Sequence, residues 1–264
     1  MHVNTFDRYR HHDSLVHILD PRVKVVITLL FIVSNVVLPD GAWFAFLTAW
    51  VFVLLITLIA RLSVVYILKG SLVVLPFMLA AVTIMFTLPG EALLTISLLG
   101  RPIEVTEPGL IRFLSIVVRS WLSVQMAILL TTTTQFPDLM HALRHLRVPA
   151  LMINIISFMY RYLFVLADEA IRLMRARDAR SAILPGRKGG GTVCWRAKVT
   201  GNMAAQLLIR SLDRSDRVYD AMLARGYRGQ LLTLNPHFMR RQDWLWGLLG
   251  ITAVVVIQAI ASIP

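Results

Sequence analysis

Long uncharged apolar runs recur along this chain and limit what it can fold into. Three of them, at residues 42–60, 70–88 and 244–263, contain no charged residue over 19, 19 and 20 positions. An apolar run of about 18 residues or more is long enough to cross the ~30 Å hydrocarbon core of a bilayer as a helix. The chain therefore has to satisfy its backbone hydrogen bonds inside lipid, which favours helices.

Two further stretches approach the same length. Residues 25–38 form a shorter run that Lys24 can extend by snorkelling, and residues 113–136 carry one charge, Arg119, near one end. Arg119 either snorkels to the outer interface or contacts a second membrane subunit. We expect five membrane spans and an all-α, polytopic membrane protein.

The composition excludes several other classes of protein. Hydrophobic residues make up 57% of the 264 residues and charged residues only 16%, whereas soluble domains have about a quarter charged residues. A soluble enzyme, a disulfide scaffold and a disordered chain are therefore poor interpretations. Cys194 is the single cysteine, so an internal disulfide and a cysteine-cluster zinc site are excluded. The polar first twenty residues give no sign of a cleavable signal peptide.

The basic residues predict the orientation. The segment up to Lys24 holds four Lys or Arg, and residues 137–243 hold 18 Lys and Arg against 8 Asp and Glu. The segment between the runs at residues 70–88 and 113–136 holds two arginines against three glutamates. Because cytoplasmic loops carry the excess of Lys and Arg, we expect the N-terminus and residues 137–243 in the cytoplasm, and the C-terminus outside.

One stretch, residues 148–167, could be a sixth span. Arg161 lies at its middle, which would cost about 2.5–3.5 kcal/mol on insertion scales, and crossing would carry the arginines that follow to the outside. We interpret this stretch as a helix at or under the inner membrane surface. Tyr160 and Tyr162 suit such an interface.

The segment 137–243 predicts two long amphipathic helices, at residues 150–183 and 193–225, separated by a Gly- and Pro-containing loop. Apolar residues recur at helical spacing on each, and these seams can bury against the other helix, the membrane domain or a partner. The first seam is Leu163, Leu166, Ala170 and Leu173; the second is Leu208, Leu212, Ser215, Tyr219 and Met222. Two ion pairs are expected four residues apart, Asp168 with Arg172 and Asp213 with Arg217.

Each of these helices ends in arginines next to small residues. The first ends Met174-Arg175-Ala176-Arg177-Asp178-Ala179-Arg180-Ser181, and the second Ala221-Met222-Leu223-Ala224-Arg225-Gly226. Gly226 suits the left-handed position that stops a helix, and a terminal arginine complements the negative end of the helix dipole. A small residue before the arginine lets the helix tip enter a groove. The pair predicts two plugs for a two-fold partner.

With these motifs the chain resembles the transmembrane T component of energy-coupling factor transporters, and more narrowly the Q-type subunit of cobalt or nickel importers. The resemblance covers nearly the whole chain. It rests on the following segments: Leu19-Asp20-Pro21-Arg22-Val23-Lys24, Leu130-Thr131-Thr132-Thr133-Thr134 with Pro137, Ala142-Leu143-Arg144-His145-Leu146-Arg147-Val148-Pro149, Met159-Tyr160-Arg161-Tyr162, Arg210-Ser211, and Ala221-Met222-Leu223-Ala224-Arg225-Gly226-Tyr227-Arg228-Gly229.

The resemblance implies a scaffold that binds two ABC ATPase subunits and a separate substrate-binding membrane subunit. In that family two crossed coupling helices end in Ala-Arg-Gly motifs that dock into the ATPases. Ala224-Arg225-Gly226 matches the second motif. Ala179-Arg180-Ser181 matches the first with serine in place of glycine, and Arg177 is a second candidate for its arginine. The implied domains are a membrane domain over 1–136, a cytoplasmic coupling domain over 137–243 and a last membrane helix over 244–264.

The resemblance also implies which groups this chain lacks. Cobalt or nickel is the transported substrate, its site lies on the substrate-binding subunit, and ATP and Mg²⁺ are bound by the ATPases. The sequence agrees in having no G-x-x-x-x-G-K-[ST] motif; residues 186–192 are a basic glycine-rich loop without the required order. We therefore expect no catalytic or metal site in this chain and a location in the bacterial inner membrane, with lipid as a further partner.

Three alternatives are weighed against this interpretation. The chain could serve vitamin importers, which nothing in the scaffold sequence excludes. A membrane-embedded lipid enzyme would need a polar cluster, for which Asp138, His141 and His145 are the compact candidates. The two histidines have the spacing of a ligand pair, but Arg144 beside them would repel a cation, so we interpret them as a solvated or interface face. Nucleic-acid binding is not expected, because the basic face is explained by the positive-inside bias and anionic lipid.

Overall fold

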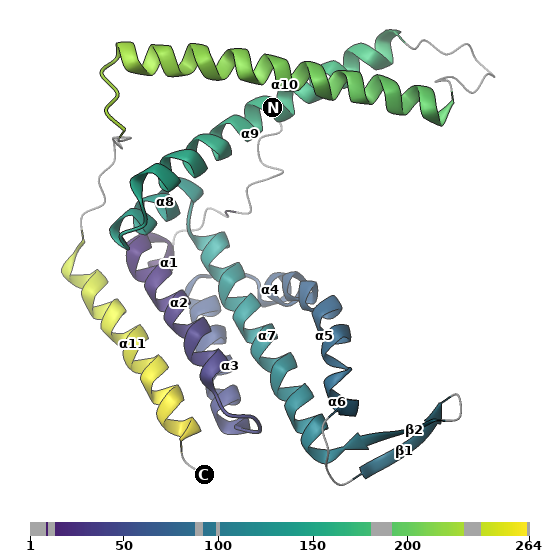
Figure 1. The fold of residues 1–264 in the computed structure, drawn as a ribbon. Coiled ribbons are helices and arrows are strands. Elements are labelled where there is room, and N and C mark those ends of the chain that lie inside the picture. Colours follow the sequence, from purple (N-terminus) through teal and green to yellow (C-terminus); the bar gives the residue numbers. More distant parts are fainter. Residues whose placement is uncertain are drawn as a thin grey trace. The chain divides into compact units, whose positions relative to one another are not determined.

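The computed structural model describes residues 9, 14–87, 92–98, 101–180, 192–229 and 239–262, and it divides into two compact units (Figure 1). One unit comprises residues 146–235. The other comprises residues 2–145 together with 236–264. The domain boundaries expected from the sequence, 136/137 and 243/244, stay a prediction.

The larger unit is mainly helical, as the sequence predicts. A short helix α1 (Leu15–Ile18) precedes α2 (Pro21–Val37) and α3 (Trp43–Ile59). The next helical stretch is broken into α4 (Val64–Ser71), a 3₁₀ turn at Leu72–Val74, α5 (Leu75–Ala81) and α6 (Ile84–Thr87). The long α7 (Glu107–Thr133), α8 (Phe136–His145) and α11 (Arg241–Ala261) complete the helices of this unit that the structure describes.

A two-stranded antiparallel hairpin, β1 (Ala92–Leu98) and β2 (Arg101–Thr106), precedes α7 and is an addition to the all-α expectation. Thr95 lies opposite Glu104 and Leu98 opposite Arg101. The signal in the sequence is the alternation of polar and apolar residues from Thr95 to Leu98, which has the period of a strand. It is short beside the apolar runs, and the sequence analysis missed it.

Four helical stretches of the described residues are long and apolar enough to cross a membrane: Val64–Ala81, Glu107–Thr133, Ala150–Arg180 and Arg241–Ala261. Three of them match expected spans, with the one expected at residues 70–88 beginning earlier and ending at Ala81. The apolar helix α3 is shorter, with 17 residues, and α2 also has 17. Ala150–Arg180 is long and apolar enough for a membrane span. From the sequence, its arginines favour a position at the inner membrane surface instead. The number of spans therefore stays a prediction.

The core of the larger unit lies between α2, α3, α7 and α11. Its largest fully buried apolar side chains are Phe31 on α2, Val53 on α3 and Leu122 on α7, each at most 1% exposed. From α11, Val254 and Ile257 complete it. Outside this core, many large apolar side chains of the same helices are exposed, among them Phe44, Leu55 and Leu248. Apolar residues on both the inner and outer faces are what a helix in lipid requires.

The N-terminal ends of α2 and α11 are tied together by Asp243. Asp20 caps α2 by accepting a hydrogen bond from the Arg22 amide at 2.9 Å, and Pro21 occupies the first turn. Asp243 is 6% exposed and accepts from the Asp20 amide at 3.2 Å and the Arg240 amide at 2.7 Å. A single carboxylate therefore caps α11 and holds it beside the beginning of α2.

Arg119 is held inside the unit by the loop between α2 and α3. Its guanidinium donates to Asp40 Oδ1 at 2.7 Å and also to the carbonyl of Leu38. The guanidinium carbon lies 5.8 Å from the centre of the Phe46 ring. The two alternatives considered from the sequence, snorkelling or a contact with a second subunit, both missed this pairing, because Asp40 is distant along the chain.

Close approach of α11 to α2 depends on a glycine. A Cβ added at Gly250 would lie 2.5 Å from Ile27 Cδ1. Small residues at helix contacts are a main source of packing in membranes, where lipid is as apolar as the side chains. We expect Gly250→Val to destabilise the purified protein by about 1–3 kcal/mol, the usual cost of overpacking. Thermal unfolding in mild detergent measures this.

Gly247 provides the matched control, because a Cβ there would lie 3.4 Å from Val23 Cγ1, close to ordinary contact. Gly247→Ala should shift the unfolding temperature much less than Gly250→Val does. A second variant that adds Ile27→Ala to Gly250→Val should recover part of the loss. Equal effects of the two glycine substitutions would contradict this account of the helix contact.

Candidate functional site

The smaller unit consists of two long helices that cross. They are α9 (Ala150–Arg180, 31 residues) and α10 (Val193–Ala224, 32 residues), close to the expected ranges. At 1.5 Å per residue each is about 47 Å long. Figure 1 shows the C-terminal ends of α9 and α10 at opposite ends of the crossed pair. The two expected helix tips are therefore far apart, as two separate docking points require.

A glutamate bridges the crossing. Glu169 on α9 accepts from Arg210 on α10 at 2.6 Å and from Arg172 at 3.0 Å. Arg172 thus pairs three residues back instead of with Asp168, and the expected pair of Asp213 with Arg217 is also absent from the ion pairs of the described residues. The sequence analysis missed Glu169, because its second partner lies 41 positions away.

Few residues of these two helices are buried. The described part of α10 has no buried residue, and α9 buries only Ile153 and Asn154. Most seam residues are exposed, including Leu163 at 41% and Leu212 at 58%, whereas Ala170, Leu173 and Met222 are half-buried. The exposed part of each seam is open to the membrane domain, the lipid or a partner.

The second helix tip ends as its sequence predicts. Gly226 has a φ of +80°, in the left-handed region, and its amide donates to the Leu223 carbonyl at 2.9 Å. The Tyr227 amide donates to the Met222 carbonyl at 3.0 Å, which completes a Schellman motif. Arg225 is exposed at the end of the helix and Ala224 precedes it. Nothing lies within 4 Å of a Cβ added at Gly226, so conformation, not space, favours glycine there.

The two candidate coupling arginines at the end of α9 differ in their contacts. Arg177 donates to Asp178 Oδ1 through Nε at 3.1 Å and Nη2 at 2.8 Å. Arg180 is the last residue of α9, is exposed beside the exposed Ala179, and forms no ion pair among the described residues. Ser181 lies outside the described residues. The geometry therefore favours Arg180 over Arg177 as the arginine that can reach a partner.

The turn after α10 is fixed to the beginning of α9. Asn154 is 6% exposed, and its Nδ2 donates to the Gly229 carbonyl at 2.7 Å and to the Tyr227 hydroxyl at 3.2 Å. A buried amide with two partners holds the chain that follows the tip in one position. Sequence reasoning missed Asn154, since nothing local distinguishes it from a polar residue on a helix.

The crossing carries a testable prediction. For the coupling role that the resemblance implies, we expect Glu169→Ala to remove the Arg210 bridge, leave Arg172 unpaired and lower substrate uptake severalfold. The folded chain should lose under about 1 kcal/mol of stability, because the pair is partly exposed. Substrate uptake by cells measures the transport effect. Glu169→Gln, which keeps a hydrogen-bond acceptor, should retain more uptake than Glu169→Ala, and Asp168→Ala is the neighbouring control. Equal uptake by all three would contradict a role for the crossing.

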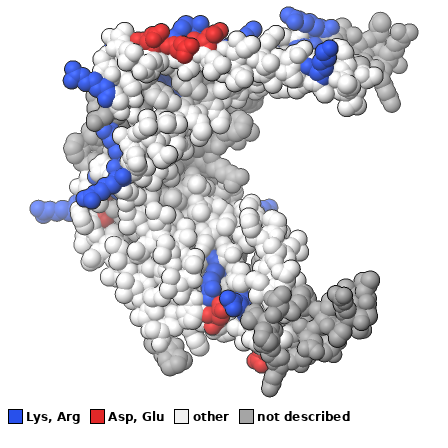
Figure 2. Space-filling view, viewed as in Figure 1, with Lys and Arg blue, Asp and Glu red and all other residues white. Residues whose placement is uncertain are grey.

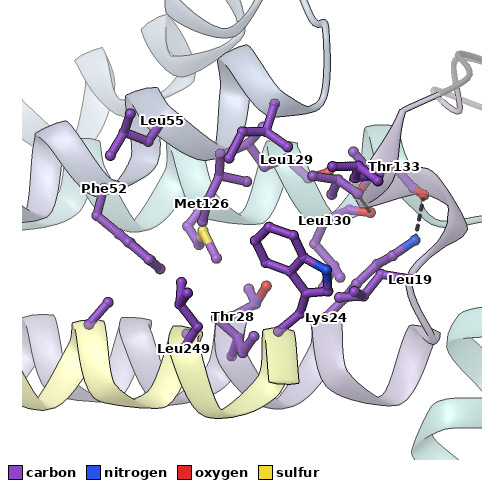
Figure 3. Close-up of a pocket in the computed structure, with 18 residues that line it drawn as sticks. Leu19, Lys24, Thr28, Phe52, Leu55, Met126, Leu129, Leu130, Thr133 and Leu249 are labelled. Carbon is purple, nitrogen blue, oxygen red and sulfur yellow. Dashed lines mark hydrogen bonds between the residues drawn. The ribbon is translucent and has the colours of Figure 1, made fainter. Parts of the chain in front are cut away.

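The larger unit contains an apolar pocket of about 280 Å³ between α2, α3, α7 and α11 (Figure 3). Lys24 lies at one end, is 7% exposed, and donates from Nζ to the carbonyls of His17 at 3.1 Å and Thr133 at 3.2 Å. The lining described by the structure contains no Asp, Glu, His or Cys. Such a lining suits an apolar chain better than a metal cation, whose ligands are those residue types.

The polar cluster considered for an enzyme lies on α8. The rings of His141 and His145 have centres 5.0 Å apart, and the His145 Nδ1 lies 3.3 Å from the His141 carbonyl oxygen. Within the described residues, no group of three or more His, Cys, Asp or Glu could hold a metal ion. The pair is a local contact on one helix face and not a converging site.

Residues 12–235 match the model of the cobalt transport protein family, CbiQ. The chain is 28% identical to the energy-coupling factor transporter transmembrane protein EcfT of Lacticaseibacillus paracasei, over 95% of this chain and 96% of that protein. It is 28% identical to the protein of the same name from Thermosediminibacter oceani, over 85% and 84%. It is 32% identical to the cobalt transport protein CbiQ of Rhodobacter capsulatus, over 57% and 59%.

Proposed function

Because the chain belongs to the cobalt transport protein family and is a membrane component of an energy-coupling factor transporter, we propose that it is the non-catalytic coupling subunit of an ATP-driven cobalt importer. Nickel is the second candidate substrate. The observation that supports this role is a pair of long crossed helices that bury almost nothing and end in exposed arginines at opposite ends. The proposed location is the inner membrane of a bacterium, with the N-terminus in the cytoplasm.

In the proposed mechanism each helix tip docks on one of two ATPase subunits. Arg180 and Arg225 form charge-assisted hydrogen bonds in a groove of the ATPase, with Ala179 and Ala224 allowing close approach. ATP binding and hydrolysis belong to those subunits, and their closure changes the distance between the two grooves. The Glu169 bridge couples the two helices, so that they change together between two arrangements. ATP bound to the distant ATPases shifts the equilibrium between these arrangements.

The exposed apolar faces of the two helices are the proposed contact with a substrate-binding membrane subunit. On α9 they include Leu163 and Leu166, which are 41% and 38% exposed and lie three residues apart on the seam. On α10 they include Leu208 and Leu212. Movement of the tips would then reach the substrate-binding subunit through these faces and release its cobalt ion toward the cytoplasm.

A shared role in vitamin import is the second candidate, because two of the relatives named above carry a transporter name without a substrate. Affinity purification of the tagged chain from its own membranes, followed by mass spectrometry, separates the candidates. We expect an ABC-type ATPase and a small membrane protein to be recovered. The small protein identifies the substrate, because it carries the binding site. Recovery of the chain alone, stable and monodisperse, would contradict the coupling role.

A further inference from the structure

Five arginines line one hollow beside the C-terminal end of α10, and we propose that this hollow binds the phosphate of an anionic phospholipid. The hollow has a volume of about 1080 Å³ and lies between α9, α10 and the turn after α10. None of the five arginines pairs with a carboxylate in the part of the chain that the structure describes. Arg161, Arg214, Arg217 and Arg228 would hold the phosphate, and the fifth, Arg225, is the tip residue whose proposed partner is the ATPase.

The acidic residues of α10 do not line the hollow, although Asp213 and Asp220 are within one turn of Arg217. Asp213, Asp216 and Asp220 are exposed at spacings of three and four, and none of them is among the residues that line it. Figure 2 shows acidic side chains gathered along one stretch of this helix pair. No carboxylate is among the residues that line the hollow, so its positive charge favours an anion.

The turn at one side of the hollow is fixed before a ligand arrives. The Schellman motif at Gly226 and the hydrogen bonds of Asn154 to Tyr227 and Gly229 hold the turn that carries Arg228. Guanidinium groups match phosphate oxygens with two parallel hydrogen bonds, which gives the contact direction as well as charge. The backbone of the turn is therefore held in one position, and the arginine side chains around the hollow can orient toward an anion that enters.

The surroundings of the hollow favour a lipid over a free anion. Phe158 and Tyr162 of α9 line the hollow, and Leu151, Ile155 and Met159 lie on the neighbouring face of that helix by helical spacing, 56–70% exposed. Amphipathic rings and an apolar stripe beside basic residues are typical of a helix at the membrane interface. The stripe would enter the acyl layer while the arginines reach the phosphates. Free inorganic phosphate has no apolar part that could contact this stripe.

Native mass spectrometry of the full chain in mild detergent tests this proposal without any ATPase, so its result is independent of the coupling role. The probes are dioctanoyl-phosphatidylglycerol, dioctanoyl-phosphatidylcholine and inorganic phosphate. The variant Arg161→Gln/Arg214→Gln/Arg217→Gln removes three charges of the hollow and leaves the tip residue Arg225 in place. The control Arg175→Gln/Arg196→Gln/Lys198→Gln removes three charges that do not line it.

We expect the chain to bind phosphatidylglycerol at least tenfold more tightly than phosphatidylcholine. The hollow variant should lose about a hundredfold in affinity for phosphatidylglycerol, from about fivefold per arginine, and the control variant under threefold. Equal losses in the two variants would overturn the proposal, because charge alone would then explain binding. So would equal affinity for the two lipids, or inorganic phosphate bound as tightly as the lipid. Loss of ATPase co-purification with unchanged lipid binding would assign the arginines to the ATPase instead.

Discussion

A chain that carries Arg180→Ala together with Arg225→Ala is expected to lose substrate uptake almost completely while still folding in the membrane. Both arginines are exposed at the C-terminal ends of α9 and α10, so their removal costs the folded chain little. Each charge-assisted hydrogen bond to a partner contributes about 1.5–3 kcal/mol, so the pair accounts for about 3–6 kcal/mol of ATPase binding. That is a hundredfold or more in affinity. Uptake of radioactive cobalt by cells that lack other importers measures the effect.

The control for this variant is Arg175→Ala with Lys198→Ala, which removes two charges from the same two helices but leaves both tips intact. It should retain uptake within about twofold. Arg177→Ala should also be tolerated, because its guanidinium is engaged by Asp178. Membrane levels of every variant are compared by immunoblot. Normal uptake by the double tip variant, at a normal membrane level, would contradict the proposed docking of the tips.

Replacing Asp243 with alanine is expected to cause the largest loss of stability among single substitutions in the larger unit. The carboxylate is 6% exposed and accepts from the amides of Asp20 and Arg240. Its removal leaves two amides without these partners and uncaps α11. Hydrogen bonds to charged groups contribute about 1.5–3 kcal/mol each and a lost cap about 1 kcal/mol, with overlap between the two, so we expect a loss of about 3–5 kcal/mol.

Thermal unfolding in detergent measures that loss, and Asp243→Asn is the matched control. Asparagine keeps one oxygen as an acceptor, so it should preserve the cap of α11 and lose less than half as much stability. Asp178→Ala, an exposed acid on α9, should change the unfolding temperature very little. Asp243→Ala with an unchanged unfolding temperature would show that the bridge between α2 and α11 does not hold these helices together.

Regular features of the chain were predictable from the sequence because their causes are local. Apolar runs gave the membrane helices, and the helical period with glycine and proline breaks gave α9 and α10 almost to their ends. Gly226 could be placed in the left-handed conformation because few other residues adopt it at low cost. The break of the helical stretch at residues 64–81 into α4 and α5, with Pro76 in the first turn of α5, was not predicted.

Contacts between distant residues were out of reach of the sequence. The sequence did not distinguish Glu169 from its neighbour Asp168. Among the ion pairs of the described residues, Glu169 bridges to Arg210 and Asp168 does not. Arg119 was identified as unusual, but its partner Asp40 lies 79 positions away. Five arginines spread over residues 161–228 look like positive-inside bias in the sequence, and only the fold brings them around one hollow. Local pattern gives elements, whereas tertiary contact selects which polar residues act together.

Transport by purified components tests the coupling role most directly. The chain alone in proteoliposomes, and then with its co-purified ATPases and small membrane subunit, is supplied with ATP, Mg²⁺ and radioactive Co²⁺. We predict that the chain alone neither hydrolyses ATP nor accumulates Co²⁺, and that the complete complex does both. Accumulation of Co²⁺ or hydrolysis of ATP by the chain alone would contradict a non-catalytic coupling subunit.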